Sequence, residues 1–155
     1  MSLIIVRKAT MKTEGDLETI VDFQQKMAKE TEDLHLEREK LLLGVKSLLE
    51  GEKSGSYYLA VQDEKIIGCT LVLDEWSDWR NATVWWIHSV YIIPEARRLG
   101  VFSTIYSYLK HQVEERKDLA GLRLYVDKRN TKAQRVYEKL GMSQEHYELF
   151  EWLKD

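Results

Sequence analysis

The sequence predicts a mixed α/β domain, in which one sheet of antiparallel and parallel strands carries helices on both faces. In the middle of the chain, two β-rich runs are separated by Gln62–Lys65, a short polar stretch typical of a hairpin turn. In the second half, strand-like and helix-like segments alternate, which favours parallel pairing. Because Gly and Pro are sparse and no linker interrupts the 155 residues, we expect a single domain over residues 1–155.

Local patterns predict the elements of the first half. Apolar residues recur near helical spacing in two segments, and Gly51 ends the second of them as a helix C-cap. Runs rich in β-branched and aromatic residues predict strands. In chain order, the expected elements are a strand at Ser2–Val6, a helix at Asp16–Ala28, an acidic connection at Lys29–Asp33, a helix at Glu37–Glu50, strands at Ser56–Gln62 and Lys65–Leu73, and a polar, aromatic loop at Asp74–Asn81.

The second half begins with a long β-rich run that ends before Pro94, because proline cannot donate a hydrogen bond to a strand ladder. After Gly100, apolar residues at a spacing of four mark one face of a helix. The expected elements are a strand at Ala82–Ile93, a helix at Val101–Lys117, a strand at Leu122–Val126, a helix at Thr131–Leu140 and a last strand at Tyr147–Leu153.

Composition argues against several classes of function. The 23 Lys and Arg against 26 Asp and Glu give a formal net charge of -3, and no basic stripe supports nucleic-acid binding. No apolar run approaches the length that spans a bilayer, so no membrane partner is expected. Cys69 is the only cysteine, which excludes an internal disulfide and fits a reducing cytoplasm, the expected location. The histidines lack metal-ligand spacing, so no metal site is expected.

The turn between Pro94 and the following helix is a candidate anion site. A strand, a short turn and a helix N-terminus follow one another there, and a helix N-terminus offers unpaired N–H groups and a partial positive charge. Gly100 allows close approach of the backbone to a ligand, and Arg97 and Arg98 add donors suited to phosphate. The pattern is also that of an ordinary strand-to-helix turn with two solvated arginines, while a single glycine argues against a dinucleotide site.

Two motifs resemble those of the GNAT N-acetyltransferase superfamily. Pro94–Phe102 is similar to the family's Arg/Gln-x-x-Gly-x-Gly/Ala turn, usually preceded by proline, although Phe102 replaces the last small residue. About thirty residues later, close to one βαβ unit, Asn130–Met142 resembles the family's Asn-x-x-Ala-x-x-x-Tyr-x-x-x-Gly-Phe stretch. Because the turn glycine already supplies close approach, we expect the Phe102 ring to point away from the phosphates.

The resemblance implies the acyl-CoA N-acyltransferase fold. That fold is a mixed, mostly antiparallel sheet of six to seven strands flanked by helices, with splayed parallel strands 4 and 5. The resemblance also implies acetyl-CoA (coenzyme A) as cofactor. Its pantetheine arm would lie in the gap between the splayed strands, and its pyrophosphate would bind at the turn Pro94–Phe102. A backbone N–H of Val90 or Tyr91 would then polarise the thioester carbonyl. The implied cofactor-binding residues are Val90, Tyr91, Ile92, Arg97, Arg98, Leu99, Gly100, Val101, Phe102, Ser103, Asn130 and Tyr137.

Asn130 and Tyr137 lie about two turns apart on one face of a predicted helix. Asn130 is the predicted N-cap, and the matching Asn of the family also contacts the cofactor. The family uses the matching Tyr as the general acid for the departing thiolate, which suits a phenol with a pKa near ~10. The amphipathic pattern around Tyr137 also fits a packed core tyrosine.

A proton acceptor is needed because the attacking amine must be neutral. His88 is expected on the strand face that it would share with Trp86, Val90 and Ile92. With a pKa near ~6.5, a histidine can take the proton directly or through water. A partly buried structural histidine, with solvent as the base, fits the same pattern.

Acceptor amines in this fold usually enter between the first two helices and the loop that joins strands three and four. The matching segments hold carboxylates and aromatic rings, which suit a cationic amine. They also fit a solvated acidic loop beside packed tryptophans. The candidate substrate-binding residues are Glu30, Glu32, Glu75, Trp76 and Asp78.

The resemblance therefore implies an acyl-CoA-dependent N-acetyltransferase. We expect transfer of an acetyl group to a primary amine of a small molecule or peptide, by direct attack in a ternary complex. The expected partners are that amine and, as is common in the family, a second copy of the chain in a homodimer. The alternative is a catalytically silent acyl-CoA-binding module, which is considered because Phe102 replaces a small residue of the family motif.

Overall fold

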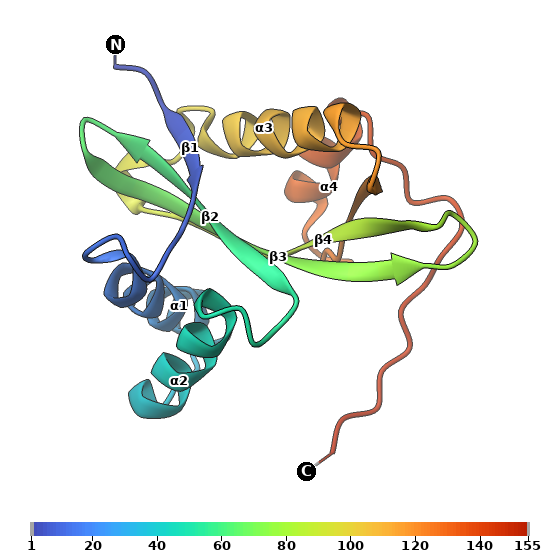
Figure 1. Ribbon diagram of the computed structural model, residues 1–155. Coiled ribbons are helices and arrows are strands. Elements are labelled where there is room, and N and C mark those ends of the chain that lie inside the picture. The colour runs from blue at the N-terminus through green and yellow to red at the C-terminus, as the bar shows by residue number, and fades with distance from the viewer. Residues whose placement is uncertain (1, 155) are drawn as a thin grey trace. The chain divides into compact units, whose positions relative to one another are not determined.

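Five strands form one mixed sheet in the part of the chain that the computed structural model describes, residues 2–154 (Figure 1). In the order β1-β2-β3-β4-β5, the first four pair antiparallel and β5 runs parallel to β4, which confirms the predicted mixed α/β class. The elements are β1 (Ile5–Lys8), α1 (Asp16–Glu32), α2 (Arg38–Leu49), β2 (Gly55–Gln62), β3 (Lys65–Ser77), β4 (Ala82–Ile92), the 3-10 turn η1 (Pro94–Ala96), α3 (Val101–Glu115), β5 (Leu119–Leu124) and α4 (Thr131–Lys139).

The chain divides into two compact units, one ending at Tyr125 and the other beginning at Val126. The first unit contains the sheet and helices α1 to α3, and the second contains α4. Among residues 2–154, no helix combines the length and the apolar character needed to cross a membrane.

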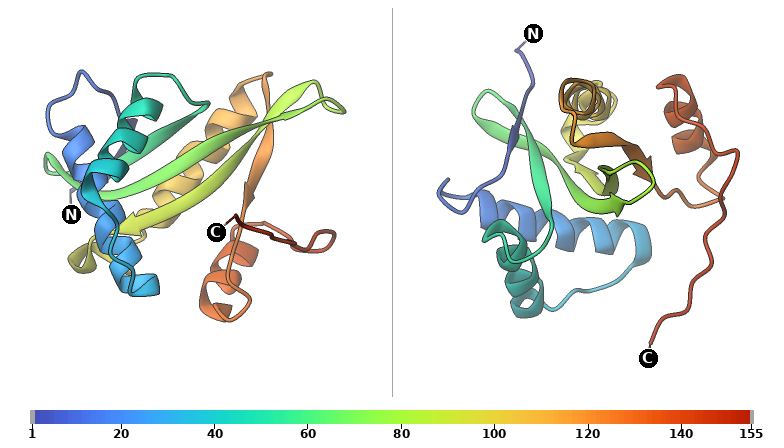
Figure 2. Two further views of the ribbon diagram at one scale, coloured as in Figure 1. Left: turned by 90° about the horizontal axis from the view of Figure 1, so that it is seen from below. Right: turned by 45° about the vertical axis from the view of Figure 1, so that its right-hand side comes forward.

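The helices of the first unit cover both faces of the sheet (Figure 2). On one face, the Phe23 ring of α1 contacts Tyr91 of β4, with ring centroids 5.0 Å apart. On the other face, Tyr108 of α3 contacts Tyr58 of β2, with centroids 5.7 Å apart. Residues that lie opposite each other on neighbouring strands point to the same face of the sheet, so the register shows to which of the two faces each paired residue points. The α1/α2 face includes Leu59, Cys69 and Tyr91, and the α3 face includes Tyr58, Thr70 and Val90.

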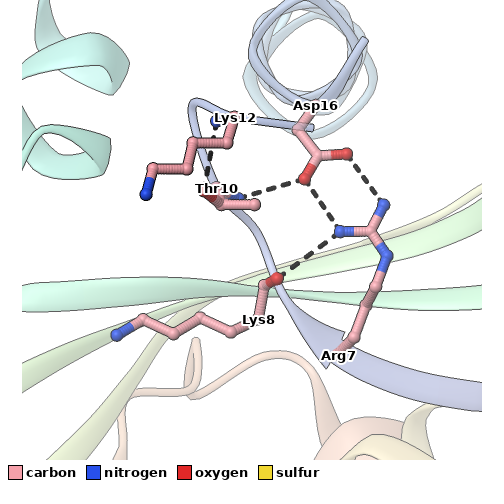
Figure 3. A network of polar contacts seen from close by, with 5 residues as sticks. All are labelled: Arg7, Lys8, Thr10, Lys12 and Asp16. Atoms are coloured by element: carbon pink, nitrogen blue, oxygen red, sulfur yellow. Dashed lines mark hydrogen bonds and ion pairs between the residues drawn. The ribbon is translucent and has the colours of Figure 1, made fainter. Parts of the chain in front are cut away.

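A buried ion pair fastens the start of α1 to β1 (Figure 3). Asp16, the first residue of α1, is fully buried, and both of its carboxylate oxygens accept hydrogen bonds of 2.8 Å from Arg7. The Thr10 N–H donates a third bond of 3.1 Å to Asp16. A buried carboxylate is stable only when it is paired in this way, so the pair fixes where α1 meets the sheet.

The predicted turn between β2 and β3 is confirmed. Asp63 and Glu64 have φ values of 50° and 64°, the left-handed conformation that a two-residue hairpin requires. The predicted loop Asp74–Asn81 is wrong in its first half, because β3 continues to Ser77. Residues 74–77 pair with β4, so backbone pairing extends the strand despite its polar side chains.

Other element boundaries also differ from the predicted ones. α1 runs to Glu32 and ends where Asp33 turns left-handed at φ 49°, so most of the predicted connection Lys29–Asp33 is helical. The predicted strand Tyr147–Leu153 is wrong, since no strand follows β5 among the described residues. The sheet of the described chain therefore has five strands instead of six to seven. Alternating apolar residues form a strand only beside a pairing edge, and the side chains of Phe150 and Trp152 are exposed.

Candidate functional site

The parallel strands β4 and β5 separate in the middle of β4, as predicted. Their pairing begins at Thr83 with Leu119 and ends at Ile87 with Leu124. From Ser89 to Ile92, β4 pairs only with β3 among the described residues. The second half of β4 therefore presents one backbone edge without a partner strand, which we call the β4 gap edge.

The direction of the N–H groups on the β4 gap edge follows from one hydrogen bond. The N–H of Ile93 donates to the carbonyl of Ile67 at 3.0 Å, so it points toward β3. Backbone groups in an antiparallel strand alternate in direction, so the N–H groups of Val90 and Ile92 point away from β3, toward the gap. The Ile92 carbonyl points the same way as the Ile92 N–H, and it accepts a hydrogen bond of 2.9 Å from Arg97 Nε instead of one from β3. Of the two predicted donors to a thioester carbonyl, Val90 has the suitable direction and Tyr91 does not.

A β-bulge interrupts β4 at His88. Val72 of β3 pairs with Ile87, and Leu71 pairs with Ser89, so His88 has no partner in the ladder. The expectation that His88 shares a face with Trp86, Val90 and Ile92 is wrong, because the bulge reverses the alternation of side chains. Trp86 shares the α1/α2 face with Ser89, whereas Val90 and Ile92 lie on the α3 face. His88 itself is exposed.

Ser89 follows the bulge and was missed by sequence reasoning. Its Oγ is buried and has no hydrogen-bond partner among the described residues. Its carbonyl accepts a 2.7 Å bond from the hydroxyl of Thr70, which is fully buried on β3. No local pattern distinguishes this serine, because its burial depends on the register of β3 and β4.

The turn after β4 supplies a row of backbone donors. Arg98 and Gly100 have φ values of 68° and 77°, and α3 begins at Val101. Among the described residues, no hydrogen bond uses the N–H of Arg98, Leu99, Gly100, Val101 or Ser103. A Cβ added to Gly100 would meet nothing within 4 Å, so the space beside the turn is open. This geometry fits a pyrophosphate at the helix N-terminus.

The two arginines of the turn have different surroundings. Besides its bond to the Ile92 carbonyl, Arg97 forms a salt bridge of 2.7 Å with Glu30 of α1. Its guanidinium also lies 5.6 Å from the centroid of the Tyr91 ring. Arg98 is exposed, and no salt bridge of the described residues involves it. Arg97 thus fastens the turn to β4 and α1, whereas Arg98 takes no part in that attachment.

Phe102 and its neighbours occupy the first turn of α3. The Phe102 ring packs near Tyr106, one turn further on, with centroids 6.3 Å apart. No atom of Phe102 lies within 4 Å of the Cβ position of Gly100. Val101 is buried, whereas Leu99 and Ser103 are exposed. The large side chain therefore leaves the space beside Gly100 open.

Glu75 belongs to an aromatic and charged cluster at the other end of β4. Its carboxylate accepts hydrogen bonds from Trp86 Nε1 and from Arg123 Nη1, the latter at 3.1 Å. The Trp86 ring contacts Tyr125, with centroids 4.6 Å apart, and the Arg123 guanidinium lies 6.0 Å from the Trp86 ring centroid. We call Glu75, Trp86, Arg123 and Tyr125 the Trp86 cluster. It lies on the α1/α2 face, as does Ser89.

The other predicted substrate residues are not brought together with Glu75. Trp76 points to the α3 face and is 63% exposed. The Asp78 carboxylate accepts the N–H of Trp79 within the β3–β4 loop. Glu30 is bound to Arg97, and Glu32 is exposed at the end of α1. No group of three or more His, Cys, Asp or Glu in residues 2–154 has the arrangement of a metal site.

The second unit contains Asn130 and Tyr137. The Asn130 side chain accepts the Ala133 N–H at 3.1 Å, which confirms its predicted role as the N-cap of α4. Tyr137 is half-buried, and this burial raises the pKa of its phenol above the ordinary value. The phenol therefore keeps its proton at neutral pH.

The comparisons with known proteins agree with the fold. The Acetyltransferase (GNAT) family model matches residues 17–142. A solved structure of a possible acetyltransferase from Clostridium difficile 630 is 38% identical, with 99% of each chain covered and a TM-score of 0.89. No curated protein matches the chain.

Two structures with lower identity share the fold alone. One is an aminoglycoside N-acetyltransferase, AAC(6')-Iy, in complex with CoA; it has 15% identity, coverage of 100% of this chain and 97% of that chain, and a TM-score of 0.73. The other is a ribosomal-protein-alanine N-acetyltransferase from Brucella melitensis biovar Abortus 2308. It has 12% identity, coverage of 97% and 100%, and a TM-score of 0.75.

Proposed function

Since this chain belongs to the GNAT acetyltransferase family, we propose that it transfers an acetyl group from acetyl-CoA to a primary amine of a small molecule or peptide. The observation that carries the proposal is the β4 gap edge, which is followed directly by the open turn at the start of α3. Together they offer N–H groups to a thioester arm and to a pyrophosphate.

Coenzyme A binding would use the turn and the gap edge in sequence. The N–H groups from Arg98 to Ser103 and the Arg98 side chain would hold the pyrophosphate. The backbone of Val90 and Ile92 would pair with the pantetheine arm, which has amide groups of its own. Asn130 is proposed as a further contact from the motif it shares with the family, in addition to capping α4.

Acetyl-CoA supplies a thioester carbonyl that an amine can attack. The amine lone pair forms the new C–N bond, the C–S bond breaks, and the sulfur leaves with its electron pair. The Val90 N–H would polarise the carbonyl oxygen, since it points into the gap. Tyr137 would donate a proton to the departing sulfur, a role that its raised pKa supports because the phenol stays protonated.

The proton lost by the amine needs an acceptor as well. His88 would take it directly or through water, and its exposed position at the bulge supports a solvent-connected route. The proposed acceptor class is supported by shared chemistry. The two structures of similar fold are named for aminoglycosides and for a ribosomal-protein alanine, both of which carry primary amines.

A catalytically silent acyl-CoA-binding module is the second candidate, because Phe102 stands where the family motif has a small residue. Two measurements distinguish it from an enzyme. A thermal shift with acetyl-CoA reports binding, and thiol release with polyamines, amino acids, aminoglycosides, arylalkylamines and peptides reports transfer. We expect a shift and turnover with at least one amine. A shift without turnover on every amine would favour the silent module, and no shift would contradict both.

A further inference from the structure

We propose that Ser89 is the residue that contacts the acceptor amine. Its hydroxyl accepts an N–H of the amine on the α1/α2 face of the sheet, where β4 leaves β5. The inference rests on the proposed acetyltransferase function and names the side chain that holds the acceptor amine.

The first reason is the unusual state of the Ser89 hydroxyl. Its Oγ is buried without a hydrogen-bond partner among the described residues, and a polar group in that state costs free energy. The hydroxyl of Thr70, on the neighbouring strand, is also buried but donates to the Ser89 carbonyl. An apolar residue at this strand position would avoid the free-energy cost of a buried hydroxyl without a partner. The hydroxyl is therefore explained if the side chains that cover it move when the acceptor binds and the acceptor supplies its partner.

The second reason is position. Pairing between β4 and β5 ends at Ile87, and Ser89 follows the bulged residue His88. Val90, the next residue, directs its N–H into the gap. Consecutive Cα atoms are about 3.8 Å apart, so the Ser89 side chain begins close to the place where a thioester carbonyl would meet the Val90 N–H. An amine bound to Ser89 would therefore lie on the side of that carbonyl nearest to the Ser89 side chain.

The third reason is the face of the sheet. Ser89 and the Trp86 cluster share the α1/α2 face, whereas Val90 points its side chain to the α3 face. The Trp86 cluster offers partly exposed aromatic surface beside an ion pair. An acceptor on this face would place its body against the cluster and its amine at Ser89. The thioester would approach along the gap edge.

The chemistry requires an acceptor for one amine N–H and no covalent intermediate. A hydroxyl oxygen that accepts this N–H directs the nitrogen lone pair away from itself and toward the carbonyl carbon. The C–N bond then forms and the C–S bond breaks, and the excess proton passes to solvent or His88. Ser89 remains unchanged through the reaction.

The test compares three variants at one position. Ser89→Thr and Ser89→Val are isosteric with each other, each one methyl group larger than serine, and only the Thr variant keeps a hydroxyl. Ser89→Ala removes the hydroxyl with the least steric change. Ser107→Ala, on an exposed position of α3, is the matched control. For each protein we would measure the melting temperature, the thermal shift with acetyl-CoA, and kcat/KM for the best amine of the panel.

The expected result is that Ser89→Ala melts at or above the wild-type temperature, that Ser89→Thr and Ser89→Val melt at a similar temperature to each other because they share the added methyl group, and that all three bind acetyl-CoA as well as wild type. The kcat/KM of Ser89→Ala and Ser89→Val for the amine should fall by about tenfold or more, with Ser89→Thr recovering part of the loss and Ser107→Ala unchanged. Wild-type kcat/KM in Ser89→Ala would overturn the inference and leave the acetyltransferase proposal intact. Loss of the acetyl-CoA shift in both Ser89→Ala and Ser89→Val would also overturn it. A wild-type protein that acetylates no amine would defeat the proposed function first, without any Ser89 variant.

Discussion

Arg97 and Glu30 form a salt bridge of 2.7 Å between positions 67 residues apart in the chain. From the sequence, Arg97 is expected to bind a phosphate and Glu30 to bind a cationic acceptor. In the structure they neutralise each other, and Arg97 also donates to the Ile92 carbonyl. The pair therefore joins the end of α1 to the start of the turn that precedes α3, and it removes one charge from each predicted site.

The first prediction separates the two arginines of the turn. Arg98→Ala should weaken acetyl-CoA binding by about threefold to tenfold and leave the melting temperature unchanged, because Arg98 has no salt bridge to lose. The effect should shrink at high salt, as expected for an exposed charge. Arg97→Gln should lower the melting temperature. Calorimetric titration and thermal melting measure both, and equal effects of the two variants on melting would contradict the assignment.

The second prediction concerns the buried ion pair of Arg7 and Asp16. Asp16→Asn should lower the free energy of unfolding by about 3 kcal/mol, at the lower end for a broken buried pair because the Arg7 side chain is 35% exposed. Asp22→Asn is the control, since the exposed pair of Asp22 with Arg38 should contribute less than about 1 kcal/mol. Urea unfolding gives both values. Similar losses in the two variants would show that burial of Asp16 does not matter.

The pH dependence of this pair has a defined sign. Hydrogen bonding to Asp16 raises the pKa of Arg7 above its ordinary, already high value. The stabilisation represented by that shift is complete below the unfolded-state pKa and is lost only as pH rises through the folded-state pKa. Arg7 therefore adds no slope to the stability of the protein between pH 6 and 9, about the range of the assays.

Local patterns predicted the features that depend on neighbouring residues. The β2–β3 turn, the glycine before α3 and the Asn130 cap each follow from a few consecutive positions, and the structure confirms them. The Arg7–Asp16 and Arg97–Glu30 pairs were missed because their partners come together only when the chain folds.

The candidate site was harder to predict because it depends on strand register. The bulge at His88 changes which side chains share a face of the sheet, and no pattern in residues 86–92 predicts the bulge. A strict alternation placed Trp86 with Val90, whereas the register places it with Ser89. For the same reason the orphaned Ser89 hydroxyl became visible only once β3 and β4 were paired.

The third prediction concerns Tyr137. Because burial raises the pKa of its phenol above the ordinary 10.0, Tyr137 should remain a proton donor throughout neutral and mildly alkaline pH. Tyr137→Phe should keep acetyl-CoA binding and lower kcat by about tenfold or more. No loss of wild-type kcat below about pH 10 should come from this group. Thermal shift and a pH series of kcat measure these outcomes, and unchanged turnover in the variant would remove Tyr137 from the mechanism.

The last prediction concerns the Trp86 cluster and the kind of amine that the protein accepts. Arg123 already neutralises the Glu75 carboxylate, so the cluster offers an aromatic surface and no unpaired negative charge. An amine attached to a flat apolar group should therefore have a higher kcat/KM than a polyamine. Trp86→Ala should lower kcat/KM for that amine by about tenfold without changing acetyl-CoA binding. Trp86→Phe retains a ring but loses the bond to Glu75, so it distinguishes aromatic contact from support of the carboxylate. Trp79→Ala is the matched control, because Trp79 is 94% exposed and belongs to the adjacent loop. A preference for polyamines, or equal kcat/KM in the Trp86 and Trp79 variants, would show that the acceptor does not lie on this cluster.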